Sequence, residues 1–185
     1  MVKFYQQTHD YEHPWSRVTV AFWLRYPNPF AAHVLSTDVI DRHVDPNGVL
    51  HTTRLILKRG NVPRWARSFM KHNEAFILEQ SHIDPATRTM VSVSKNISHK
   101  RAMVIEETQT YTVAPTDPNH RTRVKYEVRF LSNLGWGLTS KIESFSQKRF
   151  ADSSSKSRLG MAYILEKLQE KSKLPGYLFK PPQAA

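Results

Sequence analysis

The sequence 21-AFWLRYPNPFAAHVLS-36 contains the end of a helix and the start of a sheet. From Trp15 onward, apolar residues recur at steps of three and four, and this spacing places Arg25 on the apolar face of the helix. Pro27 and Pro29 end the helix, because a proline lacks an N–H donor and restricts the residue before it. An arginine is costly to bury without an anionic partner. The stretch therefore predicts a buried site for an anion beside Arg25.

Extended segments separated by turn signals precede and follow this helix in the sequence. Residues 33–44 and 49–59 form an expected hairpin, because the Asp45-Pro46-Asn47-Gly48 turn between them contains Asn-Gly. The other predicted strands are residues 2–9, 74–83, 88–98, 101–113 and 120–132. Strands that follow one another without helical crossovers indicate an antiparallel sheet.

The pattern becomes helical after Gly135 and stays so to about Lys171. We therefore predict an α+β fold, in which a curved antiparallel sheet of about seven strands holds one long C-terminal helix against its concave face. Residues 1–171 are expected to form one domain. Residues 172–185 contain three prolines and a glycine and are expected to form a flexible tail.

The overall charge is strongly positive and cysteine is absent. A net charge of +11 and a pI near 10.0 favour polyanionic partners, either nucleic acid or an anionic membrane surface. The lack of cysteine excludes disulfides, thiolate zinc sites and cysteine nucleophiles. The chain start has neither the apolar run of a secretory signal nor the Arg/Ser-rich prefix of a transit peptide.

No catalytic motif stands out in the chain. A Gly-rich phosphate loop, H-E-x-x-H and G-x-S-x-G are all missing. His9 and His13 are four residues apart, but Pro14 follows them and makes a regular metal-binding face doubtful. Glu106 and Glu107 are adjacent in a strand and so face opposite sides of the sheet. We expect no enzyme activity, no cofactor and no metal site.

Basic residues occur on faces that otherwise look buried. In the strand 49–59, Arg54 and Lys58 share a face with Ile56, although either face could point inward. In the long helix, Arg149 and Lys156 fall in an apolar sector, which also contains Leu138, Ile142, Phe145, Leu159, Gly160 and Tyr163. A second, competing apolar sector contains Phe150, Met161, Ile164 and Leu168. The sequence shows no carboxylates on the same faces, so a bound anion would offset the repulsion. The alternatives are exposure or ion pairing of the strand cations and snorkelling of the helix cations.

The segment 60–71 combines basic and aromatic side chains. Its central residues are Val62, Pro63, Arg64, Trp65, Arg67 and Phe69. Such a mixture suits the interface of an anionic bilayer, and the segment is a candidate for a lid over a binding site. The alternative is a loop whose aromatic residues anchor it to the core.

Four motifs resemble the PRELI-like family of lipid transfer proteins. They are Arg25-Tyr26-Pro27-Asn28-Pro29, His33-Val34-Leu35-Ser36, Thr52-Thr53-Arg54-Leu55 and Lys156-Ser157-Arg158-Leu159-Gly160-Met161. They occur in the order and spacing of that family, and the resemblance covers residues 1 to about 171. Within the family the chain looks most like the fungal members that carry phosphatidic acid.

The resemblance implies a START-like fold with a lipid cavity between sheet and helix. It implies a peripheral protein of the mitochondrial intermembrane space that carries phosphatidic acid from the outer to the inner membrane for cardiolipin synthesis. A small disulfide-bonded helical-hairpin protein would be its heterodimer partner. Carried over by motif, Arg25 would bind the phosphate at the cavity floor. The surrounding positive field would come from His33, Arg54, Lys58, Arg149 and Lys156, and residues 60–70 would form the lid.

Three other functions compete with this interpretation. Phosphatidylserine transfer by a sister member of the family differs only in head-group preference. A nucleic-acid-binding protein would explain the pI, but it would carry its cations on one exposed surface. A START-like enzyme would need a set of catalytic residues, and none is visible in the sequence. A carrier of another ligand, such as a neutral sterol, fits several interior cations poorly.

Overall fold

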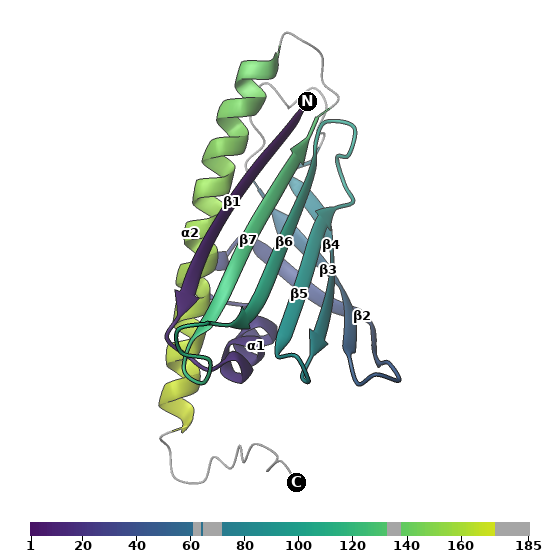
Figure 1. Cartoon of the computed structure of the whole chain (residues 1–185). Helices are drawn as coiled ribbons and strands as arrows, with labels where there is room; N and C mark the ends of the chain where they lie inside the picture. Colours follow the sequence, from purple (N-terminus) through teal and green to yellow (C-terminus); the bar gives the residue numbers. More distant parts are fainter. Residues whose placement is uncertain (61–63, 65–71, 133–137, 173–185) are drawn as a thin grey trace.

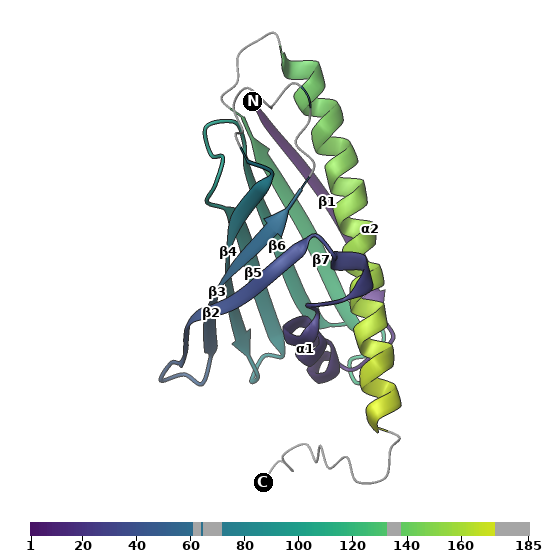
Figure 2. The same ribbon diagram turned by 180° about the vertical axis from the view of Figure 1, so that it is seen from behind.

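The computed structural model describes residues 1–60, 64, 72–132 and 138–172. Within these residues a curved sheet lies against one long helix, with a short helix near one end (Figures 1 and 2). The strands are β1 (Val2–Tyr11), β2 (Val34–Val44), β3 (Leu50–Arg59), β4 (Glu74–Asp84), β5 (Thr89–Asn96), β6 (Val104–Val113) and β7 (Thr122–Leu131). The helices are α1 (Trp15–Leu24), the 3-10 helix η1 (Pro29–Ala31) and α2 (Thr139–Ser172).

The sheet is antiparallel throughout and has the order β1-β7-β6-β5-β4-β3-β2. From β2 to β7, each strand pairs with the next strand in the chain, as expected for strands that follow one another without a helical crossover. β1 instead pairs with β7, so the first strand of the chain forms one edge of the sheet beside the last strand. The predicted antiparallel sheet of about seven strands is confirmed.

Local sequence chemistry explains the strand boundaries. In the β2–β3 turn, Asp45 Oδ1 accepts hydrogen bonds from the Asn47 and Val49 N–H groups at 2.9 and 3.0 Å, and Gly48 takes a φ of +81°. β6 begins three residues later than predicted. The reason is a turn in which the Ala102 N–H donates to the His99 carbonyl oxygen at 3.0 Å.

Two apolar clusters hold the helices on the sheet. At one end, α1 contributes Trp15, Val18 and Phe22, which pack with residues of the sheet and with Met161 and Leu165 of α2. At the other end, the sheet residues Tyr126, Val128 and Phe130 and their neighbour Met103 pack with Ile142 of α2. In Figures 1 and 2, α2 runs along the β1 and β7 side of the sheet. The inner face of β3 to β6 is therefore left largely free of α2.

The structure shows which face of β3 points inward, a point that the sequence left open, and it corrects one prediction about α2. On β3 the inward face is the one with Thr52, Arg54 and Ile56, which are at most 4% exposed. On α2 the predicted buried residue Leu159 is 48% exposed. The buried residues of the helix are Ile142 and Gly160 from the first apolar sector, Met161 and Ile164 from the second, and Ser146, Ser154 and Leu165. No helix in the described part of the chain has the length and apolarity needed to cross a membrane.

Candidate functional site

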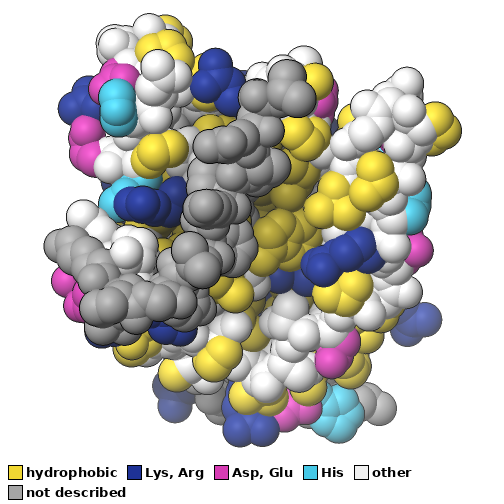
Figure 3. All heavy atoms as spheres, turned by 90° about the horizontal axis from the view of Figure 1, so that it is seen from below, with side chains coloured by type: hydrophobic (Ala, Val, Ile, Leu, Met, Phe, Trp, Pro, Cys, Tyr) yellow, Lys and Arg dark blue, Asp and Glu magenta, His cyan; other side chains and the backbone are white. Residues whose placement is uncertain are grey.

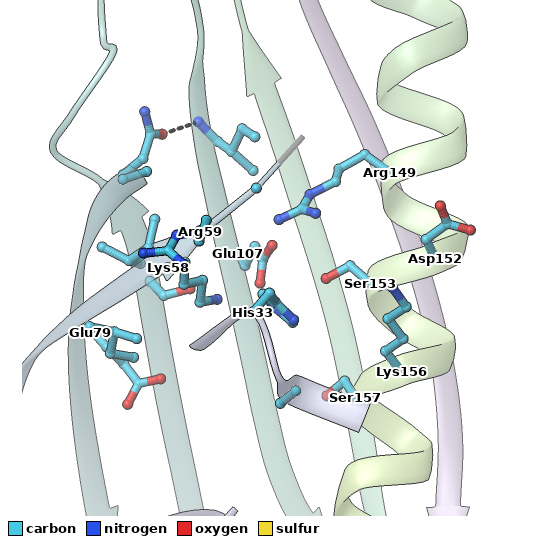
Figure 4. Close-up of a pocket in the computed structure, with 18 of the residues that line it drawn as sticks. His33, Lys58, Arg59, Glu79, Glu107, Arg149, Asp152, Ser153, Lys156 and Ser157 are labelled. Atoms are coloured by element: carbon cyan, nitrogen blue, oxygen red, sulfur yellow. Dashed lines mark hydrogen bonds between the residues drawn. The ribbon is translucent and has the colours of Figure 1, made fainter. Parts of the chain in front are cut away.

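A cavity of about 870 Å³ lies between α2, the segment around η1 and the inner face of strands β3 to β7. This volume is in the range of small-molecule binding sites in proteins. Its walls come from segments far apart in the chain, as Figure 4 shows. The sheet, η1 and α2 must therefore all be in place before the cavity exists.

The cavity wall combines apolar side chains with polar and charged ones. Along β4 the inward side chains run from Ile77 to Glu79, and along β6 they run from Ile105 to Glu107. α2 starts at the same end as these strands (Figure 1) and contributes Phe145 to the apolar part of the wall. Lys58 lies opposite Ala75 in the register, so charged groups occur beside the apolar side chains as well as at the α1 end.

Cationic side chains from three segments converge on this cavity. Lys58 from β3, and Arg149 and Lys156 from α2, all line it, and so does His33 from the segment between η1 and β2. Figure 4 shows these side chains extending into the space between the sheet and the helix. Lys148 and Arg59 line the cavity as well. The wall thus offers several positive charges to an anion.

Arg25 lies at the α1 end of the cavity and is 9% exposed. Its Nη2 donates to Glu79 Oε2, and its Nη1 donates to the Phe22 carbonyl oxygen at 3.0 Å. The guanidinium carbon also lies 3.7 Å from the centre of the Phe22 ring. Arg25 therefore ties the end of α1 to strand β4.

Glu79 overturns the expectation that the buried cations have no carboxylate among them. Its carboxylate is shared, because Arg54 Nε donates to Oε1 at 2.8 Å while Arg25 binds Oε2. Burial alone would raise the pKa of Glu79, but the two arginines hold it below its ordinary value. Two guanidinium groups share one carboxylate, so the cluster keeps one net positive charge.

Arg54 differs from the other predicted head-group residues in its position. It pairs with Glu79 across β3 and β4, is 4% exposed and is not part of the cavity wall. Its guanidinium carbon lies 4.7 Å from the centre of the Trp23 ring on α1. The structure brings the other five predicted residues together in the cavity wall: Arg25, His33, Lys58, Arg149 and Lys156. Arg54 instead lies behind Glu79 and binds its carboxylate.

His33 is half-buried beside the cations of the cavity. Burial, and then the charges of Lys58, Arg149 and Lys156, lower its pKa to about 4. At neutral pH, His33 therefore offers a hydrogen bond and no charge, which limits its part in the predicted positive field.

We expect the imidazole of His33 to titrate near pH 4 in an NMR titration of the ligand-free protein. Between about pH 6.5 and 4 the unfolded chain binds a proton at this position and the folded chain does not, so the free energy of unfolding should fall as the pH is lowered through that window. Lys156→Gln removes one of the repelling charges and should raise the titration midpoint. A midpoint near 6.5 in both proteins would contradict this assignment.

Tyr26 is a site residue that the motif contained but that sequence reasoning used only as a helix end. It lines the cavity between two cations. Burial would raise the pKa of its hydroxyl, but Lys58 and Arg25 lower it. The signal in the sequence was its place next to Arg25 in Arg25-Tyr26-Pro27-Asn28-Pro29.

Asn28 and Gly160 explain why two of the quoted motifs occur together. Asn28 Oδ1 accepts from the Phe30 N–H at 2.8 Å and caps η1, while its Nδ2 donates to the Arg25 carbonyl oxygen. A Cβ atom at Gly160 would lie 3.0 Å from Asn28 Nδ2. The missing side chain lets α2 approach this segment and completes the cavity wall.

The predicted lid cannot be placed. Arg64 is exposed, whereas Val62, Pro63, Trp65, Arg67 and Phe69 lie outside the described residues. The predicted tail beyond Ser172 lies outside them as well.

Comparisons with known proteins point to one family. A family model described as the PRELI-like family matches residues 16–171. Protein UPS1, mitochondrial, of Saccharomyces cerevisiae is 39% identical over 171 residues, covering 92% of this chain and 97% of its own length. Protein ups1 homolog of Schizosaccharomyces pombe is 36% identical over 152 residues, with 82% and 88% covered. PRELI domain-containing protein 1, mitochondrial, of Homo sapiens is 37% identical over 172 residues, with 91% and 78% covered.

Solved structures support the fold independently. The protein TTHA0849 of Thermus thermophilus matches with a TM-score of 0.60 at 14% identity, covering 90% of this chain and 99% of the other. The Zhui aromatase/cyclase of Streptomyces sp. R1128 matches with a TM-score of 0.59 at 8% identity, covering 95% and 99%. At such identities the likeness concerns the fold alone, and that fold is START-like.

Proposed function

The chain belongs to the PRELI-like family, and we propose that it is a lipid carrier that moves phosphatidic acid from the outer to the inner mitochondrial membrane. This transfer would supply cardiolipin synthesis. The protein would act without a catalytic step and without a cofactor, because binding and release of the lipid are all that a carrier needs.

One observation carries the proposal: cations from β3 and α2, together with His33 and Arg25, converge on a single cavity that is also lined by apolar side chains. A phosphate monoester is small and highly charged, and guanidinium and ammonium groups bind such oxygens with strong charge-assisted hydrogen bonds. The apolar side chains would contact the acyl chains. A nucleic-acid-binding protein would present these cations on the outside, which the positions of Arg25 and Lys58 do not support.

The proposed location is the intermembrane space, at the surface of the inner membrane. Relatives in fungi and animals are named mitochondrial, and this chain is a mitochondrial protein by the same membership. Its net charge of +11 would favour contact with an anionic bilayer.

We also propose the small disulfide-bonded helical-hairpin protein as heterodimer partner. Exposed apolar side chains on α1 and β2 support this, since Leu24 is 50% exposed and Val44 is 63% exposed. Figure 3 shows hydrophobic side chains gathered in a hollow on one face, with Lys and Arg side chains nearby. Failure of the partner to co-purify with the tagged chain would contradict the heterodimer.

Transfer between liposomes tests the proposed function. Donor vesicles would contain fluorescent phosphatidic acid, phosphatidylserine or phosphatidylcholine, with the partner protein present or absent. We expect selective transfer of phosphatidic acid. Loss of two charge-assisted contacts in Arg149→Gln/Lys156→Gln should slow the transfer at least roughly tenfold.

The matched control is Lys167→Gln, which removes a charge from the same helix at an exposed position paired with Glu170. It should transfer phosphatidic acid like the original protein. Preference for phosphatidylserine would replace the proposed lipid with the alternative one. Transfer of no lipid, even with the partner present, would refute the carrier function.

A further inference from the structure

Among the described residues, three carboxylates line the cavity beside its cations: Glu79, Glu107 and Asp152, of which Asp152 is exposed. Glu107 lies on the inward face of β6, next to Ser94 of β5 in the sheet register. Figure 4 shows its side chain reaching into the space between Lys58 on the sheet and Arg149 on α2. A negative group at this place works against the binding of an anion, unless it makes a specific contact.

Glu107 differs from Glu79 and Glu106 in its partners. Glu79 is neutralised by Arg25 and Arg54. Glu106, on the outer face of the same strand, pairs with Lys95 at 3.3 Å and with Arg129 at 3.7 Å. Among the described residues, no ion pair within 4.0 Å engages Glu107, whose side chain is half-buried.

The surroundings of Glu107 place it near the cationic set. Burial raises the pKa of the Tyr126 hydroxyl on β7, the charge of Glu107 and a hydrogen bond with it raise this pKa further, and Arg149 lowers it, so both groups lie close to one ring. Besides burial, the charges of Lys58, Arg149 and Lys156 lower the pKa of His33, so Arg149 also lies near this imidazole. An anion held by these cations would therefore have the Glu107 carboxylate as a neighbour.

A carboxylate beside a phosphate can distinguish monoesters from diesters. An ionised carboxylate only accepts hydrogen bonds. A singly protonated phosphate monoester carries one P–O–H group that can donate to it, whereas a phosphate diester has none. Sites built to pair with a hydroxyl reject analogues that lack it, because a buried polar group is then left unpaired.

We propose that Glu107 selects the phosphate monoester head group by accepting a hydrogen bond from its P–O–H. This inference rests on the proposed function and gives it a basis for head-group selectivity. The cations bind any phosphate, and Glu107 makes the protonated monoester the favoured one. Phosphatidic acid has such a head group, while phosphatidylserine and phosphatidylglycerol are diesters.

The test compares two anionic phospholipids at pH 6, where about half of phosphate monoester groups carry a proton and these protonated groups have the same charge as a diester. Donor liposomes would contain fluorescent phosphatidic acid or fluorescent phosphatidylglycerol, and the measured quantity is the ratio of the two transfer rates. Glu107→Gln should lower this ratio roughly tenfold to a hundredfold, because a glutamine amide also donates to unprotonated oxygens. Glu106→Gln is the matched control on the opposite face and should keep the original ratio.

Glu107→Asp provides a second variant that keeps the charge and withdraws the carboxylate by one methylene group. It should also lower the ratio, and circular dichroism would verify that each variant is folded. An original ratio in both Glu107 variants would overturn the selectivity proposal while leaving the carrier function intact. If the unmodified protein transfers neither lipid, the carrier function itself fails and this inference fails with it.

Discussion

Glu79→Gln is expected to lower the free energy of unfolding by about 3–5 kcal/mol, the usual result of removing one partner from a buried ion pair. The substitution leaves the guanidinium groups of Arg25 and Arg54 next to each other, buried and without a carboxylate. Urea unfolding followed by circular dichroism measures the change. A domain of ordinary stability would lose a large part of its free energy of unfolding.

The chain contains a matched control for this experiment on the same two strands. Glu74 of β4 pairs with Arg59 of β3 at 2.8 Å, directly opposite in the register, just as Glu79 pairs with Arg54. The difference is burial, because the Glu74 pair is exposed to solvent. Glu74→Gln should therefore change the free energy of unfolding only slightly. Equal effects of the two substitutions would show that burial does not make the Glu79 pair important.

The pH dependence of stability follows from the same pair. The arginines lower the pKa of Glu79, so its carboxylate stabilises the fold above the pKa of the unfolded chain. This contribution is lost as the pH falls through the lower pKa of the folded state. Glu79→Gln should make stability less dependent on pH in this acidic range.

The fold could be predicted from the sequence because its signals are local. Pro27 and Pro29 end a helix, Asn47-Gly48 forms a turn, and alternation along residues 49–59 marks a strand. These features depend on backbone chemistry within a few residues. The same reasoning correctly placed Glu106 and Glu107 on opposite faces of one strand.

The partner of Arg25 could not be predicted in the same way. Glu79 is 54 residues away from Arg25 in the sequence, and only the register of β3 against β4 brings its carboxylate to the buried arginines. The sequence did contain a signal, because Glu79 lies two residues from both Ile77 and Ser81 and therefore shares their face of the strand. Without the register, a single glutamate in a strand is more simply read as solvent-exposed.

The orientation of α2 was predicted only in part. Arg149 and Lys156 face the cavity as expected, but Leu159 points to solvent. The helix is apolar on two sides, so periodicity alone could not choose between them. Contacts of Gly160 with Asn28 and of Met161 with the core fix the rotation of the helix.

Arg25→Glu should have an even larger effect on stability than Glu79→Gln. It places a new carboxylate beside Glu79 at a position that is 9% exposed, and it removes the stacking on Phe22. Like charges at that distance in a buried site add repulsion to the cost of the lost pair. We expect a loss of about 5 kcal/mol or more, which leaves the protein largely unfolded at neutral pH.

This expectation changes how Arg25 can be tested as a phosphate ligand. Loss of lipid transfer in Arg25→Glu would reflect loss of the fold, so Arg25→Lys is the informative variant. Lysine keeps the charge opposite Glu79 but cannot bind Glu79 and the Phe22 carbonyl oxygen with a planar fork. Arg59→Glu, which opposes Glu74 at the surface, is the control for the charge reversal and should remain folded. If Arg25→Glu unfolds in urea like Arg59→Glu, the structural role assigned to Arg25 is wrong. If Arg25→Lys stays folded and loses phosphatidic acid transfer, Arg25 contacts the phosphate in addition to anchoring α1.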